Sequence, residues 1–195
     1  TTTASQKSHL TKASNKQVSS KQEYSRNSAK SSSLPDLRKY PSGTPRKKAF
    51  LRTVMPYITS QNAAITAERN WLISKQYQGQ WSPAERARLK DIAKRYKVKW
   101  SGNTRKIPWN TLLERVDIIP TSMVATMAAA ESGWGTSKLA RNNNNLFGMK
   151  CMKGRCTNAP GKVKGYSQFS SDKESVRAYV TDLNTHPAYS SFRKS

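Results

Sequence analysis

The sequence predicts a mainly α-helical protein, and three stretches support this prediction. Between Pro120 and Gly133 the apolar side chains recur at the three-and-four spacing that gives a helix one apolar face. The other two stretches begin with a serine that is followed three residues later by a glutamate, at 82–85 and at 171–174. This spacing is the capping box that starts a helix, so we expect helices after Ser82 and after Ser171.

The part of the chain before residue 100 is predicted to be a helical region behind an unstructured tail. Residues 1–33 consist mainly of Ser, Thr, Lys, Gln and Asn, and so few apolar side chains do not offset the entropy lost on ordering. We expect a disordered basic tail over 1–33 and a helical region over 34–100. Within that region, residues 46–77 predict one long helix or two, with Pro56 at the kink or break.

The chain is strongly basic, which restricts its partners without choosing among them. Its 35 Lys and Arg against 11 Asp and Glu give a net charge of +24 over 195 residues. Such a charge attracts polyanions, and nucleic acids, anionic membrane surfaces and phosphate-bearing cell walls all qualify. No run approaches the about 18 apolar residues of a membrane span, so we expect no transmembrane segment.

Glu131 is the carboxyl group that the sequence singles out. It follows three alanines and precedes Gly133-Trp134-Gly135, which should end the helix. The negative end of the helix dipole and apolar neighbours both disfavour its ionisation, which suits a proton donor near neutral pH. A lone glutamate at a helix end is more often a solvated surface residue. Here, however, residues 142–148 add amides and an aromatic ring, the groups that a sugar-binding groove requires, so we expect the general acid of a glycosidase.

Two motifs in this region resemble a known family. ESGWGTS at 131–137, followed by NNLFG at 144–148, is similar to the signature of the bacterial glucosaminidases of glycoside hydrolase family 73, in the Bax-like branch. The resemblance continues through 166–189 and reaches upstream to Leu34, so it covers about 34–195. It implies a lysozyme-like helical fold with a small β-like lobe beside the cleft. It also implies a catalytic domain over 101–195 that hydrolyses the β-1,4 bond after N-acetylglucosamine in peptidoglycan.

The resemblance also implies roles for individual residues. Glu131 is expected to be the catalytic acid, with Tyr189 beside it. The residues expected to bind substrate are aromatic or amide side chains of the two motifs and of the following segment: Trp134, Asn144, Asn145, Phe147 and Tyr166. Cys151 and Cys156 are the only cysteines, and both histidines lie far from them in the sequence. A local disulfide is therefore favoured over a metal half-site, and we expect neither a metal nor a cofactor.

The second catalytic group is the open point of the mechanism. Glycoside hydrolysis ordinarily uses two carboxylates, yet residues 150–165, where many family members carry a second glutamate, contain no acid. Asp172 and Glu174 fit the first turn of a capped helix instead. We therefore expect the substrate's own 2-acetamido group to attack the anomeric carbon, with Tyr166 or Tyr189 assisting, while direct inversion by water remains the alternative.

Other functions also stay open at this stage. A muramidase or lytic transglycosylase of the same fold would share the lone glutamate, a non-catalytic wall-binding module would keep the groove, and a nucleic-acid-binding protein would explain the charge. The chain stops at Ser195, where Bax-like sequences continue, so the cleft is expected to lack one wall. We expect a monomer in the periplasm or cell envelope whose export signal has been removed, because the chain begins with Thr1.

Overall fold

The structure is a computed structural model that describes residues 34–151 and 159–195. The predicted tail over 1–33 lies outside the described residues. Residues from Asp36 to Ser195 form one compact unit, so the regions predicted as 34–100 and 101–195 share a single body from Asp36 onward. Nearly all regular structure in this body is helical, and the described residues form no strand.

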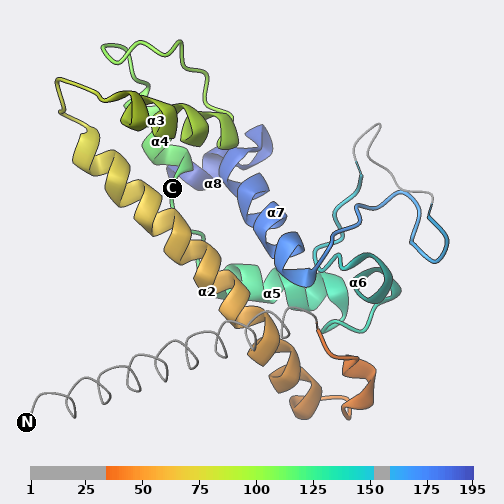
Figure 1. The fold of residues 1–195 in the computed structure, drawn as a ribbon. Helices are drawn as coiled ribbons and strands as arrows, with labels where there is room; N and C mark the ends of the chain where they lie inside the picture. The colour runs from red at the N-terminus through yellow and green to blue at the C-terminus, as the bar shows by residue number, and fades with distance from the viewer. Residues whose placement is uncertain (1–33, 152–158) are drawn as a thin grey trace, which may run out of the picture. The chain divides into compact units, whose positions relative to one another are not determined.

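The mainly helical fold class is confirmed, and Figure 1 labels its α-helices. In chain order the elements are η1 (Leu37–Lys39), α2 (Thr44–Lys75), α3 (Pro83–Arg95), α4 (Trp109–Arg115), α5 (Thr121–Ser132), α6 (Lys138–Asn143), α7 (Asp172–Thr185), η2 (Pro187–Tyr189) and α8 (Ser190–Lys194). The class is that of the predicted lysozyme-like helical domain.

The long helix α2 is the support on which the other helices pack. Its buried side chains form one stripe, Ala49, Phe50, Val54, Ile58, Ile65 and Leu72. Both α5 and α7 contact α2, and Figure 1 shows α5 against the middle part of α2. Of the two predicted alternatives, one helix or two, the structure has one, and Pro56 lies inside it. The proline ring is exposed, so the carbonyl that loses its helical partner is free to bond to water.

Polar side chains of α2 hold the segment that leads into α5. Asn62 donates from Nδ2 to the carbonyl of Ile119 at 2.7 Å and accepts from the Ile119 N–H at 3.2 Å. About two turns further on, Arg69 donates to the carbonyls of Leu113 and Val116. These bonds satisfy backbone groups at the end of α4 and just before α5, and they fix where α5 begins.

The capping box that begins α3 is confirmed in both directions. The Ser82 hydroxyl accepts from the Glu85 N–H at 3.2 Å, and the Glu85 carboxylate accepts from the Ser82 N–H at 3.0 Å. Glu85 also contacts the ammonium group of Lys75 and the amide of Gln78. The hydrogen bond from Lys75 contributes most to lowering the pKa of Glu85 from 4.5 to about 2, and the bonds from Ser82 and Gln78 lower it further. Glu85 therefore ties the end of α2 to the start of α3.

The contribution of Glu85 to the stability of the folded state should decrease at low pH. A carboxyl group whose pKa is depressed on folding stabilises the folded state above its unfolded pKa, and the contribution is lost as the pH falls toward the folded value. We expect Glu85→Gln to lower the urea midpoint at pH 6, and the difference from the wild type to shrink as the pH falls from about 5 to 2. A difference that stays constant over this range would show that Glu85 gains nothing from being ionised.

Candidate active site

Glu131 lies on the last turn of α5, as predicted. Gly133 follows in the left-handed conformation, with φ +57°, and its N–H closes the helix on the carbonyl of Ala129. The expected apolar enclosure of the carboxyl group is wrong, because Glu131 is exposed. The buried residues of α5 are Val124, Ala125, Ala128, Ala129 and Ser132, and Glu131 falls at the edge of the face that they form.

The turn that ends in Gly148 passes directly beside this carboxylate. Gly148 has φ +64°, and a Cβ atom placed on it would stand 3.2 Å from Glu131 Oε2. Asn145 holds the turn in place. Its Oδ1 accepts from the N–H groups of Phe147 and Met149, and its Nδ2 donates to the carbonyls of Met149 and Ser167 at 2.9 and 3.1 Å. Asn145 is 1% exposed, so its whole amide serves the turn.

Tyr179 connects this turn to Glu131 from the side of α7. Its ring stacks on Phe147 with centroids 4.1 Å apart and an interplanar angle of 8°. Burial raises the pKa of Tyr179, and the charges of Tyr189, Glu131 and Asp182 raise it further. The three acidic groups therefore share an electrostatic neighbourhood around one phenol.

Neither Tyr179 nor Asp182 was among the predicted site residues. The apolar stripe of α7 favoured packing for Tyr179, and the stack on Phe147 agrees with packing of its ring. The sequence carries no signal that its phenol is influenced by the charge of Glu131. Asp182 lies one turn after Tyr179, and the i, i+3 spacing was the available sign that both share this side of the helix.

Tyr189 is held near Tyr179 by the end of the chain. Tyr189 is the last residue of η2, and His186 is the N-cap of η2. The ring centroids of Tyr189 and His186 are 6.0 Å apart. His186 Nδ1 accepts from the Ala188 N–H. The side chain of Arg193 is 3% exposed and donates to the carbonyls of Leu183 and His186, at 3.1 and 2.8 Å. The turn that carries Tyr189 is therefore braced against the end of α7.

The other predicted substrate residues have partners within the protein. Trp134 packs edge-on against Phe50, with centroids 5.7 Å apart, and the ammonium group of Lys47 lies 5.0 Å from its ring. The turn can pack this closely because residue 135 is a glycine: a Cβ atom there would stand 2.6 Å from Leu37 Cδ1 and 3.2 Å from Phe50 Cδ2. The Gly-Trp-Gly turn thus packs against η1 and the first turns of α2.

The asparagine run fixes backbone segments, which corrects the expectation that its amides line a groove. Asn143 is fully buried and bonds to both backbone groups of Val163. Asn144 caps α6 at φ +52° and donates to the carbonyl of Phe169 at 3.0 Å. Short amide side chains tolerate the left-handed region and satisfy nearby backbone groups, which is the physical reason for this use.

The segment after Met149 contains less regular structure than a β-like lobe. Among the described residues it shows one isolated antiparallel bridge, between Lys150 and the half-buried Tyr166. Cys151 is disulfide-bonded, and Cys156, the other half of the predicted pair, lies outside the described residues. No group of three His, Cys, Asp or Glu in 34–151 and 159–195 is placed to hold a metal ion.

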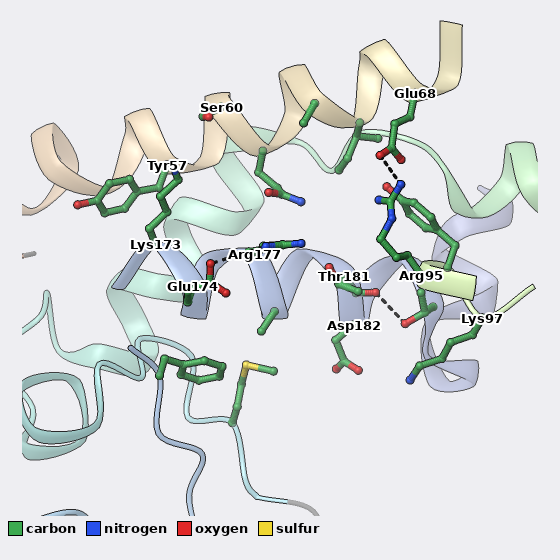
Figure 2. Close-up of a pocket in the computed structure, with 18 residues that line it drawn as sticks. Tyr57, Ser60, Glu68, Arg95, Lys97, Lys173, Glu174, Arg177, Thr181 and Asp182 are labelled. Atoms are coloured by element: carbon green, nitrogen blue, oxygen red, sulfur yellow. Dashed lines mark hydrogen bonds and ion pairs between the residues drawn. The ribbon is translucent and has the colours of Figure 1, made fainter. Parts of the chain in front are cut away.

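A cavity of about 760 Å³ lies between α2 and α7 (Figure 2). Glu131 does not line it. Met149 and Asp182 do, and each is adjacent to the surroundings of Glu131: Met149 follows Gly148, and Asp182 follows Tyr179 by one turn. The cavity therefore neighbours the candidate active site without containing its acid.

Comparison with known proteins gives the class to which this fold and site belong. The sequence profile of the family described as mannosyl-glycoprotein endo-beta-N-acetylglucosaminidase matches residues 108–195, which include Glu131, Tyr179 and Tyr189. That domain is found in glycoside hydrolases, which act on glycans. The chain is also similar to "Protein bax" of Escherichia coli (strain K12), at 98% identity over all of this chain and 71% of that protein. The chain therefore belongs to the Bax-like proteins with a glucosaminidase domain.

No solved structure gives a significant match to the chain. Within the described residues, none of the helices combines the length and the apolar character of a membrane span.

Removal of the Asn145 amide should destabilise the protein strongly. Asn145→Ala leaves buried N–H and carbonyl groups of the turn without partners, and we expect a loss of about 2–4 kcal/mol in the free energy of unfolding. Asn142→Ala is the matched control, because the Asn142 side chain makes no hydrogen bond to a described residue, and it should stay within about 0.5 kcal/mol of the wild type. Urea unfolding measures both. Equal effects would contradict the role of Asn145.

A methyl group at Gly148 should impair the site beyond its effect on stability. Gly148→Ala forces a left-handed alanine, at a cost of about 1–2 kcal/mol, and presses on the Glu131 carboxylate. Gly161→Ala is matched, because Gly161 has φ +81° with nothing within 4 Å of its Cβ position. We expect similar losses in urea unfolding but a loss of glycan hydrolysis only in Gly148→Ala. Equal activity of the two variants would show that the contact with Glu131 is unimportant.

Proposed function

We propose that this protein is an endo-β-N-acetylglucosaminidase that hydrolyses the β-1,4 bond after N-acetylglucosamine in peptidoglycan, in the periplasm or cell envelope. The observation that supports it best is the position of Glu131. Its carboxylate stands at the end of α5, against Gly148 and within electrostatic reach of the Tyr179 phenol, inside a region that matches a glucosaminidase family.

In the proposed reaction Glu131 protonates the glycosidic oxygen of the leaving sugar. The carboxyl group is exposed in the free protein, so the bound glycan itself must exclude water from it. Burial by the substrate favours the protonated form, which is the form that donates. The carboxylate that is left after proton transfer is then placed to activate water for the second half of the reaction.

The two tyrosines are proposed to orient the reacting sugar. Tyr179 is rigid because its ring stacks on Phe147, and Tyr189 is braced by Arg193 through the end of α7. Burial and neighbouring charges raise the pKa of Tyr179, so its phenol stays protonated. The phenol can therefore donate a hydrogen bond. The acceptor that we assign to it is the 2-acetamido carbonyl, which must be aligned with the anomeric carbon if it attacks.

Glu131→Gln tests the acid. It removes the proton donor but keeps the shape of the side chain, and we expect at least about a hundredfold loss of fragment release from purified peptidoglycan, because general acid catalysis contributes that much. Glu85→Gln is the same substitution on α3 and should leave release unchanged. Mass spectrometry identifies the new reducing end, and proton NMR of the first product gives its anomer. A β product fits participation of the acetamido group, and an α product fits direct inversion.

Other products would move the protein to another class. Reducing N-acetylmuramic acid would indicate a muramidase, and its anhydro form would indicate a lytic transglycosylase. Binding of the wall without any release would indicate a binding module. That last reading has one observation in its favour, since the stretch where a second acid was expected contains none among its described residues. Undiminished release by Glu131→Gln would refute the role of Glu131 in every one of these classes.

A further inference from the structure

The groove between α2 and α7 has a chemistry that differs from that of the candidate active site. One wall is the face of α2 from Tyr57 to Glu68, and the other is the face of α7 from Lys173 to Thr185. Arg95, Tyr96 and Lys97 close one end, and Met149 and Phe169 complete the lining. Small side chains, Ala64 on α2 and Ala178 on α7, leave the space open between the two helices.

Charged groups of both signs line this groove. Arg95 is neutralised by Glu68, at 2.7 Å, and by Asp91. Lys97 and Lys173 are exposed and have no carboxylate partner among the described residues. Figure 2 shows Lys173 rising from α7 beside Tyr57.

Two further groups are only weakly engaged. Arg177 faces Glu174 at 3.7 Å, where both side chains are about half exposed. An ion pair of this kind contributes little and is easily exchanged for a ligand. Asp182 points away from α2 in Figure 2 and makes no ion pair with any described residue. The groove therefore offers exchangeable cations along α7 and a carboxylate at its end near Tyr179.

These groups match a charged ligand better than a neutral sugar. Ammonium and guanidinium groups bind carboxylates through charge-assisted hydrogen bonds, which are about twice as strong as neutral ones. N-acetylglucosamine carries no charge. The stem peptides of peptidoglycan carry several carboxylates and a free amino group, and their methyl groups suit the apolar floor of Met149 and Phe169.

The position of the groove allows both parts of one substrate to bind together. Met149 directly follows Gly148, which stands against Glu131, and the charge of Asp182 reaches Tyr179. A glycan strand whose sugar lies at Glu131 therefore has the mouth of the groove beside it. We infer that the α2–α7 groove binds the stem peptide of the strand being cleaved, with Lys173 and Arg177 receiving its carboxylates. This inference rests on the proposed function.

The test compares two substrates with one double variant. Lys173→Ala/Arg177→Ala removes two exposed cations from α7 while keeping good helix formers, and Lys90→Ala/Lys94→Ala on α3 removes two exposed cations that do not line the groove. Each is assayed on intact peptidoglycan and on the same material after an amidase has removed the stem peptides. We expect the α7 variant to lose roughly tenfold in kcat/KM on intact peptidoglycan only, because two charged contacts are lost. The α3 variant should match the wild type on both substrates.

The outcomes separate this inference from the proposed function. Equal losses on both substrates, or no loss on either, would overturn the groove assignment while the hydrolase stands. If the wild type cleaves neither substrate, the proposed function fails, and a direct measurement remains. Titration of Glu131→Gln with a soluble stem tetrapeptide, followed by NMR, should then shift the amide signals of 173–185, and the shifts should vanish in the α7 variant. Shifts elsewhere only, or none, would refute the groove as a peptide site.

Discussion

The packing of α5 and α7 on α2 is the constraint on which the rest of the structure depends. Glu131 is carried by α5 and Tyr179 by α7, and both helices pack against α2, which buries a stripe of apolar side chains. Each large apolar side chain in that stripe contributes about 1.5–3 kcal/mol when it is removed from water. The positions of α5 and α7 therefore depend on how they pack against α2.

Around this helical frame, buried and half-buried polar side chains hold the segments that connect the helices. Asn62 holds the start of α5, Asn145 holds the turn at Gly148, and Arg193 holds the turn of Tyr189. Each bonds to backbone groups of a connecting segment or of a helix end, and Arg193 also faces the Glu114 carboxylate at 3.6 Å. Segments without a regular hydrogen-bonding pattern need such partners, since an unsatisfied buried backbone group costs as much as a lost hydrogen bond. The rigidity of the site thus comes from side-chain-to-backbone bonds.

The surroundings of Glu131 and the α2–α7 groove are neighbouring surfaces, and they differ in how far they are exposed to water. Glu131 is exposed, so in the proposed reaction the bound glycan must cover it. The α2–α7 groove is already enclosed on two sides and carries charges that are mostly paired or weakly paired. A branched substrate, with a neutral glycan and a charged peptide, fits such a division better than a linear neutral chain does. The strong positive charge of the whole chain adds attraction to an anionic wall without fixing orientation.

Sequence reasoning succeeded where structure is decided within a few residues. The starts of α3 and α7 and the end of α5 at Gly133 all follow from caps and apolar spacing. The resemblance in ESGWG and NNLFG identified the family, and the role of Glu131 that it implies stays a prediction. Where side chains point was harder to predict. Trp134 was expected at the substrate and packs on Phe50, because nothing in the motif shows that α2 lies beside it.

The sequence by itself therefore determined the helices, their ends and the charge of the chain. Tertiary structure alone decided the exposure of Glu131, the use of the asparagine run and the influence of the Glu131 charge on Tyr179. The reason is physical. Caps and periodicity are interactions over three or four residues, whereas Asn143 finds its partners 20 residues away and the pKa of Tyr179 is raised by a carboxylate 48 positions earlier. Such contacts exist only after α5 and α7 have packed on α2, and no local pattern encodes them.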